Sequence, residues 1–139
     1  MLLTYDQILE QLKEKGINLS YQRLKVLDFL YKNQIHPTVE QIYLGLVKQI
    51  PTLSKTTIYN TLKILINAGL VREIPFKGRE SCYDINLDPH GHFCCDSCNQ
   101  IYDFQIDVNL IKSKDLEDFK IRDRDVYFKG VCSRCLSKI

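Results

Sequence analysis

The first 70 residues carry apolar side chains at helical spacing. Between residues 5 and 12, for example, Tyr5, Ile8, Leu9 and Leu12 recur every three or four positions. Such spacing places apolar groups on one face of a helix, where they can pack against a core. The same spacing recurs three more times, which predicts helices over residues 5–15, 21–33, 39–47 and 54–69.

Residues at the ends of these segments support the helices. Ser20, Thr38 and Ser54 precede three of them, and their hydroxyls can accept hydrogen bonds from the first free backbone N–H groups. Gly16 and Gly69 follow the first and fourth, where glycine readily takes the left-handed conformation that ends a helix. We therefore expect four capped helices.

The pattern changes after Gly69. The stretch LVREIPFKGRESCYDI alternates apolar and polar residues, which predicts two strands around Lys77-Gly78-Arg79. Three or more helices followed by a hairpin with a basic tip is the order of a winged helix-turn-helix domain. We place this domain at residues 1–84.

Residues 85–139 form a second, smaller domain by their pattern. HFCC and QIYDF predict a hairpin, DVNLIKSKDLEDF a helix, and YFKGVC a further strand. Asn86, Asp88 and Pro89 mark a turn, so we place a hinge at about residues 84–89. The predicted class is α+β, an N-terminal winged-helix domain followed by a small α/β domain.

Composition narrows the location and partners of the chain. It has 139 residues, 45% hydrophobic and 26% charged, and no run approaches the ~20 apolar residues that span a bilayer. Its N-terminal residues alternate charged and apolar side chains, unlike a signal peptide. We expect a cytoplasmic protein without a membrane partner. Residues 1–84 carry eleven Lys and Arg against eight Asp and Glu, which favours nucleic acid as a partner of the first domain.

Four of the six cysteines form two CxxC pairs, Cys95/Cys98 and Cys132/Cys135. Each tight CxxC turn presents two sulfurs on one side, and two such turns can complete a closed tetrahedral site, which suits structural Zn²⁺. The alternatives are redox-active dithiols or cysteines buried in a core. For Cys82 and Cys94 we expect a buried apolar role, since Cys94 alternates with Cys95 along a strand.

A second set of side chains offers nitrogen and oxygen donors. The only histidines are His36, His90 and His92, and Asp84 and Asp103 are acids near them in the chain. Such a set suits divalent iron, manganese, zinc or nickel. A histidine before proline can also be a simple turn residue, and the other two can be surface polar groups. A zinc hydrolase is a further alternative, although no general acid stands outside the set.

Four stretches together, IHPTVEQIY, SKTTIYNTLKILINAGLV, HGHFCCDSCNQIYDF and GVCSRC, resemble the ferric uptake regulator family of metal-dependent repressors. The resemblance covers nearly the whole chain in order. It implies a dimerisation domain with a four-cysteine zinc site, a homodimer that binds DNA, and no enzymatic activity. It also implies a regulatory Fe²⁺ or Mn²⁺ at the hinge, held by His36, Asp84, His90, His92 and Asp103.

Two features favour one branch of this family. Asp103 and Asp84 resemble the acids of the peroxide-sensing repressor (PerR) branch, whereas the iron-sensing branch usually has Glu at the first position. Arg124 stands where relatives with an additional metal site often have His. The resemblance thus implies peroxide sensing through Fe(II)-catalysed oxidation of His36 and His90. The alternative is a repressor that senses the iron or manganese level alone.

The fourth predicted helix is our candidate recognition helix. Its first two turns carry polar side chains that can enter the major groove of double-stranded DNA. The second helix and the hairpin tip add residues that can reach the phosphate backbone. A solvated helix face is the alternative. The resemblance implies an A/T-rich inverted repeat as the operator. The candidate DNA-binding residues are Gln22, Arg23, Lys25, Lys55, Thr56, Thr57, Tyr59, Asn60, Lys77 and Arg79.

Overall fold

The computed structural model describes residues 3–76, 78–85, 90–107, 112–121 and 124–138. The chain divides into two compact units, Met1–Asp88 and Pro89–Ile139, close to the division predicted between residues 84 and 85. The proposed hinge at residues 84–89, with Asn86, Asp88 and Pro89, lies mostly outside the described residues. No helix among the described residues is long and apolar enough to cross a bilayer.

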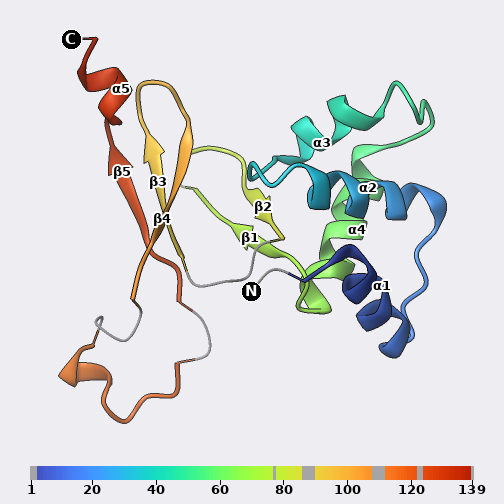
Figure 1. Ribbon diagram of the computed structural model, residues 1–139, viewed down its shortest axis with the longest axis horizontal. Helices are drawn as coiled ribbons and strands as arrows, with labels where there is room; N and C mark the ends of the chain where they lie inside the picture. The colour runs from blue at the N-terminus through green and yellow to red at the C-terminus, as the bar shows by residue number, and fades with distance from the viewer. Residues whose placement is uncertain (1–2, 77, 86–89, 108–111, 122–123, 139) are drawn as a thin grey trace. The chain divides into compact units, whose positions relative to one another are not determined.

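The first unit consists of a helical layer followed by a short hairpin (Figure 1). All four helices that the hydrophobic pattern predicts are present. Helices α2, α3 and α4 contact one another, as a helix-turn-helix core requires. The helices are α1 Tyr5–Glu14, α2 Tyr21–Lys32, α3 Val39–Leu46 and α4 Lys55–Asn67.

Local side-chain chemistry fixes the ends of these helices, as the sequence predicts. Ser20 and Ser54 accept hydrogen bonds from backbone N–H groups of α2 and α4, and Thr38 forms a full capping box with Gln41. Gly69 takes φ +75° after α4, and the neighbouring Leu70 N–H bonds to the carbonyl of Leu65 at 3.0 Å. This bond is the Schellman closure of a helix C-terminus.

One continuous apolar core joins the helices of the first unit to its hairpin. In α4 the predicted stripe of Ile58, Leu62 and Leu65 is buried, and Thr61 beside it donates its hydroxyl to the Thr57 carbonyl at 2.7 Å. In α2 the predicted Leu24 is only half-buried, because Val26 occupies the core face with Leu27 and Leu30. Core members outside α2 and α4 include Ile8, Leu12, Val39, Ile42, Leu46, Leu70, Val71, Tyr83 and Ile85.

The predicted hairpin is formed by β1 (Arg72–Ile74) and β2 (Cys82–Asp84), which pair antiparallel with Arg72 opposite Asp84. Its strands are shorter than the alternation suggests. In the connection, Gly78 takes φ +81°, a conformation that glycine adopts without strain. Lys77 lies outside the described residues.

A three-stranded sheet forms the centre of the second unit (Figure 1). The predicted hairpin pairs β3 (His90–Cys95) with β4 (Ile101–Gln105) in antiparallel fashion, and β5 (Tyr127–Gly130) runs parallel to β3 on its other side. A single turn of helix, α5 (Ser133–Leu136), follows β5. The central strand β3 therefore carries both predicted histidines and one cysteine of the first CxxC pair.

The predicted helix over DVNLIKSKDLEDF is wrong for the residues described there. Only a 3₁₀ turn, η2 (Lys114–Leu116), forms, and Ser113 caps it by accepting from the Asp115 N–H at 3.2 Å. The apolar positions Leu116 and Phe119 are 43% and 66% exposed, so no core packs against them. A short helix without tertiary packing is marginal in water, which explains the error.

Candidate metal centres and nucleic-acid surface

The two CxxC pairs converge on one point, as predicted. The four sulfurs, from Cys95, Cys98, Cys132 and Cys135, lie within 4.8 Å of one another. Cys95 Sγ is 3.7 Å from Cys135 Sγ, and Cys98 Sγ is 3.8 Å from Cys132 Sγ. Zinc–sulfur bonds of about 2.3 Å in a tetrahedron put neighbouring sulfurs about 3.8 Å apart. The spacing therefore fits a zinc ion held by four thiolates.

Hydrogen bonds around the sulfurs favour ionisation of two of the four thiols, Cys95 and Cys132. Backbone N–H groups of Cys132 and Cys98 donate to Cys95 Sγ at 3.4 and 3.5 Å and lower the pKa of Cys95. The Tyr102 hydroxyl donates to the Cys132 sulfur and lowers the pKa of Cys132 to about 6. The ionised Cys132 in turn raises the pKa of Cys135 to about 12. A bound cation would offset the repulsion between neighbouring thiolates, and the four convergent sulfurs fit a structural zinc site.

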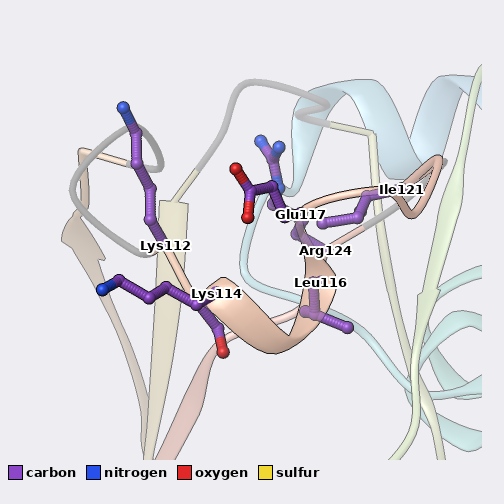
Figure 2. A pocket seen from close by; sticks show the side chains of 7 residues that line it. Lys112, Lys114, Leu116, Glu117, Ile121 and Arg124 are labelled. Carbon is purple, nitrogen blue, oxygen red and sulfur yellow. The ribbon is translucent and has the colours of Figure 1, made fainter.

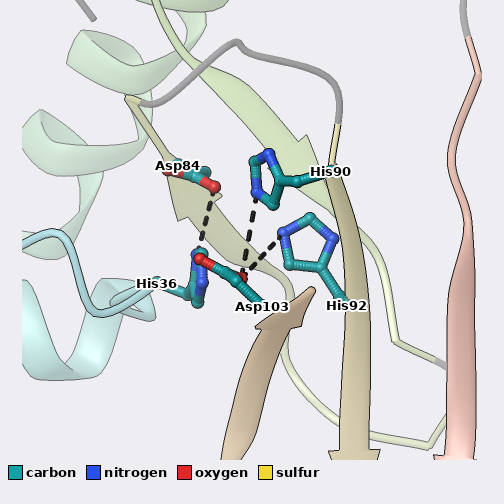
Figure 3. Close-up of polar contacts among 5 residues, drawn as sticks. All are labelled: His36, Asp84, His90, His92 and Asp103. Carbon is teal, nitrogen blue, oxygen red and sulfur yellow. Dashed lines mark ion pairs between the residues drawn. The ribbon is translucent and has the colours of Figure 1, made fainter. Parts of the chain in front are cut away.

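One face of the sheet in the second unit gathers three of the five predicted regulatory ligands. His90 and His92 alternate with Gly91 along β3, and Asp103 of β4 pairs directly with His92. Asp103 Oδ1 is 3.5 Å from His92 Nε2 and 3.8 Å from His90 Nε2 (Figure 3). Metal bonds of about 2.1 Å set neighbouring donor atoms about 3.0–3.4 Å apart, so these three donors lie slightly farther apart than the ligands of one bound ion.

Gly91 allows this face to form. A Cβ at Gly91 would meet the ring of Phe104 at 2.2 Å, because Phe104 pairs with Gly91 and covers it on the opposite face. Phe104 also stacks on Phe128 with ring centroids 5.1 Å apart. The strand thus presents histidines on one face and an aromatic layer on the other.

The first unit holds the other two predicted ligands. His36 Nδ1 lies 3.2 Å from Asp84 Oδ2, and both side chains are buried (Figure 3). The Tyr83 N–H donates to the Pro37 carbonyl at 3.0 Å, which ties the segment before α3 to β2 and brings His36 to Asp84. His36 has φ +57°, which is uncommon for a residue other than glycine. Such local strain is frequent at functional sites.

A separate pocket of about 390 Å³ lies in the second unit (Figure 2). It contains none of the predicted metal ligands. Basic side chains dominate its polar lining, including Arg124, the residue at the position where some relatives carry an additional ligand. A cationic lining of this kind favours an anionic ligand over a metal ion. The lining residues are Lys112, Ser113, Lys114, Leu116, Glu117, Ile121 and Arg124.

Most of the predicted DNA-binding residues of α4 are accessible. Tyr59 is 52% exposed, and Thr56 and Asn60 are exposed on the same two turns. Thr57 is less accessible than these residues, because it is half-buried. Its hydroxyl lies 3.0 Å from the hydroxyl of the cap residue Ser54. This contact gives Thr57 a role in closing the helix end.

Several other candidate DNA-binding residues make contacts within the chain. Gln22 donates to the Thr52 hydroxyl at 2.9 Å. Lys25 lies over the Tyr21 ring at 5.5 Å, and Arg79 lies over the Phe76 ring at 5.4 Å. Arg23 is half-buried at the start of α2, and Lys77 lies outside the described residues.

Sequence reasoning missed three partners of these candidates. Lys55 forms an ion pair with Glu40 of α3, Tyr102 donates to a zinc-site sulfur, and Phe104 covers Gly91. Each contact joins residues far apart in the chain and follows no spacing rule. Only the HGH and QIYDF stretches, read as paired strands, could have suggested the third.

Most of the chain is similar to proteins of one known family. The profile of the Ferric uptake regulator family matches residues 14–129. The peroxide-responsive repressor PerR of Staphylococcus aureus (strain Mu50) is 32% identical over 136 residues, which are 96% of this chain and 92% of that protein.

Solved structures give the same result at the level of the fold. A structure described as the basis for peroxide sensing and gene regulation by PerR from Streptococcus pyogenes is 29% identical, with a TM-score of 0.57, and covers 97% of this chain and 95% of that one. The ferric uptake regulator Fur of Helicobacter pylori, described as having three functional metal-binding sites, is 22% identical, with a TM-score of 0.76 and the same coverage.

Proposed function

The chain belongs to the ferric uptake regulator family, and from this premise we propose that it is a dimeric, metal-dependent repressor of transcription that senses peroxide. Members of this family are regulators rather than enzymes. One observation carries the proposal. All five predicted ligands are described, and each unit brings its own ligands together, His36 with Asp84 and His90 with His92 and Asp103.

In this proposal one Fe²⁺ or Mn²⁺ takes ligands from both units, while zinc at the four cysteines is structural. A metal can stabilise the DNA-binding arrangement only by binding it better than the alternatives. A site with ligands on two units has such a preference, because separating the units removes ligands. Metal loading thereby controls repression.

Peroxide sensing adds a chemical step at the histidines. Fe²⁺ held by these ligands would convert hydrogen peroxide into an oxidant beside the imidazole rings and would be regenerated, because the histidine supplies both electrons. The carbon between the two nitrogens of His36 or His90 loses its C–H bond and gains a carbonyl oxygen, while one peroxide is reduced to water. The oxidised ring is a poorer ligand, so the site loses metal affinity and the protein leaves DNA. The identity to a peroxide-responsive repressor supports this step, as does Asp103.

The proposed DNA surface is the exposed face of α4 with the hairpin tip. In a symmetric dimer two such helices read the two halves of an inverted repeat, for which we propose an A/T-rich sequence. Tyr59 can contact a thymine methyl and Asn60 an adenine edge, and Lys55, Thr56 and Arg79 can contact phosphates.

The test compares protein loaded with Fe²⁺ and with Mn²⁺ before and after hydrogen peroxide. Fluorescence anisotropy follows binding to a labelled duplex, and mass spectrometry follows peptides that contain His36 and His90. We expect a one-oxygen gain with Fe²⁺ only, together with loss of binding. Asp103→Glu is a matched variant that keeps the charge; it should keep metal-dependent binding and oxidise more slowly, because its carboxylate is displaced by one methylene.

Two other results would select other functions. Unmodified peptides with binding that follows metal concentration would identify a sensor of the iron or manganese level. Six titratable thiols in protein that holds no zinc, and their loss on peroxide treatment, would identify a thiol-based redox protein, because bound zinc would mask four thiols.

A further inference from the structure

The first residue of the candidate recognition helix is held by a neighbouring acid. Lys55 of α4 forms an ion pair with Glu40 of α3, and its Nζ lies 5.4 Å from the centre of the Tyr43 ring. The side chains of Lys55 and Glu40 are 49% and 43% exposed, so both remain accessible to a large ligand. We call these three residues the Lys55 cluster.

The cluster offsets an unfavourable position for a cation. A positive side chain in the first turn of a helix is repelled by the positive end of the helix dipole. The carboxylate of Glu40 compensates by accepting a hydrogen bond from Lys55, which raises the pKa of Lys55. Glu40 also stands in the first turn of α3, where a negative charge is favourable. The positive ends of the α3 and α4 dipoles therefore both stabilise the Glu40 carboxylate beside Lys55.

A phosphate group of DNA and a carboxylate compete for the same partner. Both are anionic acceptors, and each forms its strongest hydrogen bond when an ammonium group donates to it directly. A phosphate that approaches the start of α4 must either displace Glu40 from Lys55 or lie beside it against charge repulsion. In both cases DNA binding loses part of the contact that Lys55 offers.

We propose that Glu40 is an internal competitor for the DNA backbone at Lys55, which weakens binding to every duplex and leaves sequence preference unchanged. This inference rests on the proposed DNA-binding function and deepens it. Phosphates are the same in every sequence, so their loss reduces operator and non-operator affinity by the same factor.

The test is a double-mutant cycle in the metal-loaded protein. Glu40→Gln keeps the size and hydrogen-bonding shape of the side chain and removes its charge. We expect it to tighten binding about three- to tenfold at low salt, on an operator and on a non-operator duplex alike, since an exposed ion pair and the repulsion it relieves are of this order. The slope of log affinity against log salt should become steeper by about 0.9, the value for one additional phosphate contact.

Matched variants isolate the contact. Glu10→Gln makes the same charge change on α1, outside the Lys55 cluster, and should alter affinity less than twofold. In a Lys55→Gln background, Glu40→Gln should give a clearly smaller gain than in the wild type, because only relief of charge repulsion remains. Thermal melting shows that each variant folds.

The outcomes separate this inference from the proposed function. Equal affinities of the wild type and Glu40→Gln, or an equal gain in the Lys55→Gln background, overturn the competitor role and leave DNA binding standing. A gain on one duplex only overturns the claim of unchanged preference. Failure of the metal-loaded wild type to bind any duplex at low salt overturns both the proposed function and the inference.

Discussion

The two units of this chain achieve stability by different means. The first buries a continuous set of aliphatic side chains from four helices and a hairpin. Among the described residues of the second, the buried apolar side chains are only Cys94, Cys95 and Cys132. Many of its large apolar residues are exposed instead, namely Tyr102, Leu116, Phe119, Ile121, Tyr127, Phe128, Val131 and Leu136.

The two units therefore depend on different components for their folding free energy. The first unit has the core of an ordinary small domain. The second has little core of its own, so four convergent sulfurs must supply much of its folding free energy through a metal ion. Its exposed apolar side chains suit a surface that a second copy covers, in agreement with the proposed dimer.

The largest effect should follow loss of zinc from the second unit. Structural zinc contributes about 10–16 kcal/mol in small zinc domains, as much as the whole stability of a typical domain. Cys95→Ala should abolish zinc binding and remove hydrogen-exchange protection from β3, β4 and β5, while α2 and α4 stay protected. Elemental analysis and hydrogen-exchange mass spectrometry measure the two effects.

The neighbouring residue provides the control for this variant. Cys94→Ala removes a buried sulfur from the other face of β3 and should retain one zinc ion per chain. Loss of zinc from Cys94→Ala, or protection of the sheet in zinc-free Cys95→Ala, would contradict the proposed division of roles.

Truncation of a core side chain should destabilise the first unit and leave the zinc site of the second unit intact. Leu62→Ala leaves a cavity among fully buried side chains of the first unit and should cost about 2–5 kcal/mol of unfolding free energy. Zinc content should not change. Leu44→Ala on α3, where Leu44 is 61% exposed, is the control and should cost less than about 0.5 kcal/mol. Denaturant unfolding followed by circular dichroism distinguishes them, and equal costs would disprove the assigned core.

A smaller effect should follow from Gly91→Ala in the second unit. The new methyl group collides with the Phe104 ring, and overpacking of this kind costs about 1–3 kcal/mol. Manganese affinity should fall as well, because His90 and His92 flank the displaced residue. In the control Gly130→Ala, the Cβ would lie 3.4 Å from Phe93, an ordinary contact. Isothermal titration calorimetry should therefore show a normal manganese affinity for Gly130→Ala; equal losses in both variants would exclude a special role for Gly91.

The smallest effect should come from the cap of α4. Ser54→Ala removes the acceptor for the Thr57 N–H, which lies 3.1 Å from the Ser54 hydroxyl, and should cost about 1 kcal/mol. Ser54→Gly should cost only a few tenths of that amount, since glycine leaves the cap open to water. Thermal melting of the two variants resolves the order, and a larger loss for glycine would indicate a conformational rather than a capping role.

Local rules predicted the first unit well from its sequence. Caps, helix-ending glycines and apolar periodicity are properties of a few neighbouring residues, so Ser20, Thr38, Ser54 and Gly69 could be assigned before the fold was known. Leu24 was misplaced because a helical stripe has a width of several residues, and packing decides which of its edges is buried.

The same rules were less successful in the second unit. The CxxC pairs and the HGH stretch predicted their clusters, since ligand chemistry limits what such residues can do together. The helix over DVNLIKSKDLEDF failed because periodicity indicates a helix only when a partner surface buries its apolar face. The contacts Glu40–Lys55 and Gly91–Phe104 depend on tertiary pairing that no short stretch encodes.

Strand β3 contributes side chains to two candidate metal centres, and the alternation of side chains along the strand separates them. His90 and His92 occupy even positions and belong to one cluster, and Cys95 occupies an odd position and belongs to the other. Insertion or deletion of one residue between His92 and Cys95 would therefore turn one set of donors to the wrong side, even if every ligand survived. Changes of two residues would preserve the sides, so natural length variation in this strand should come in even steps.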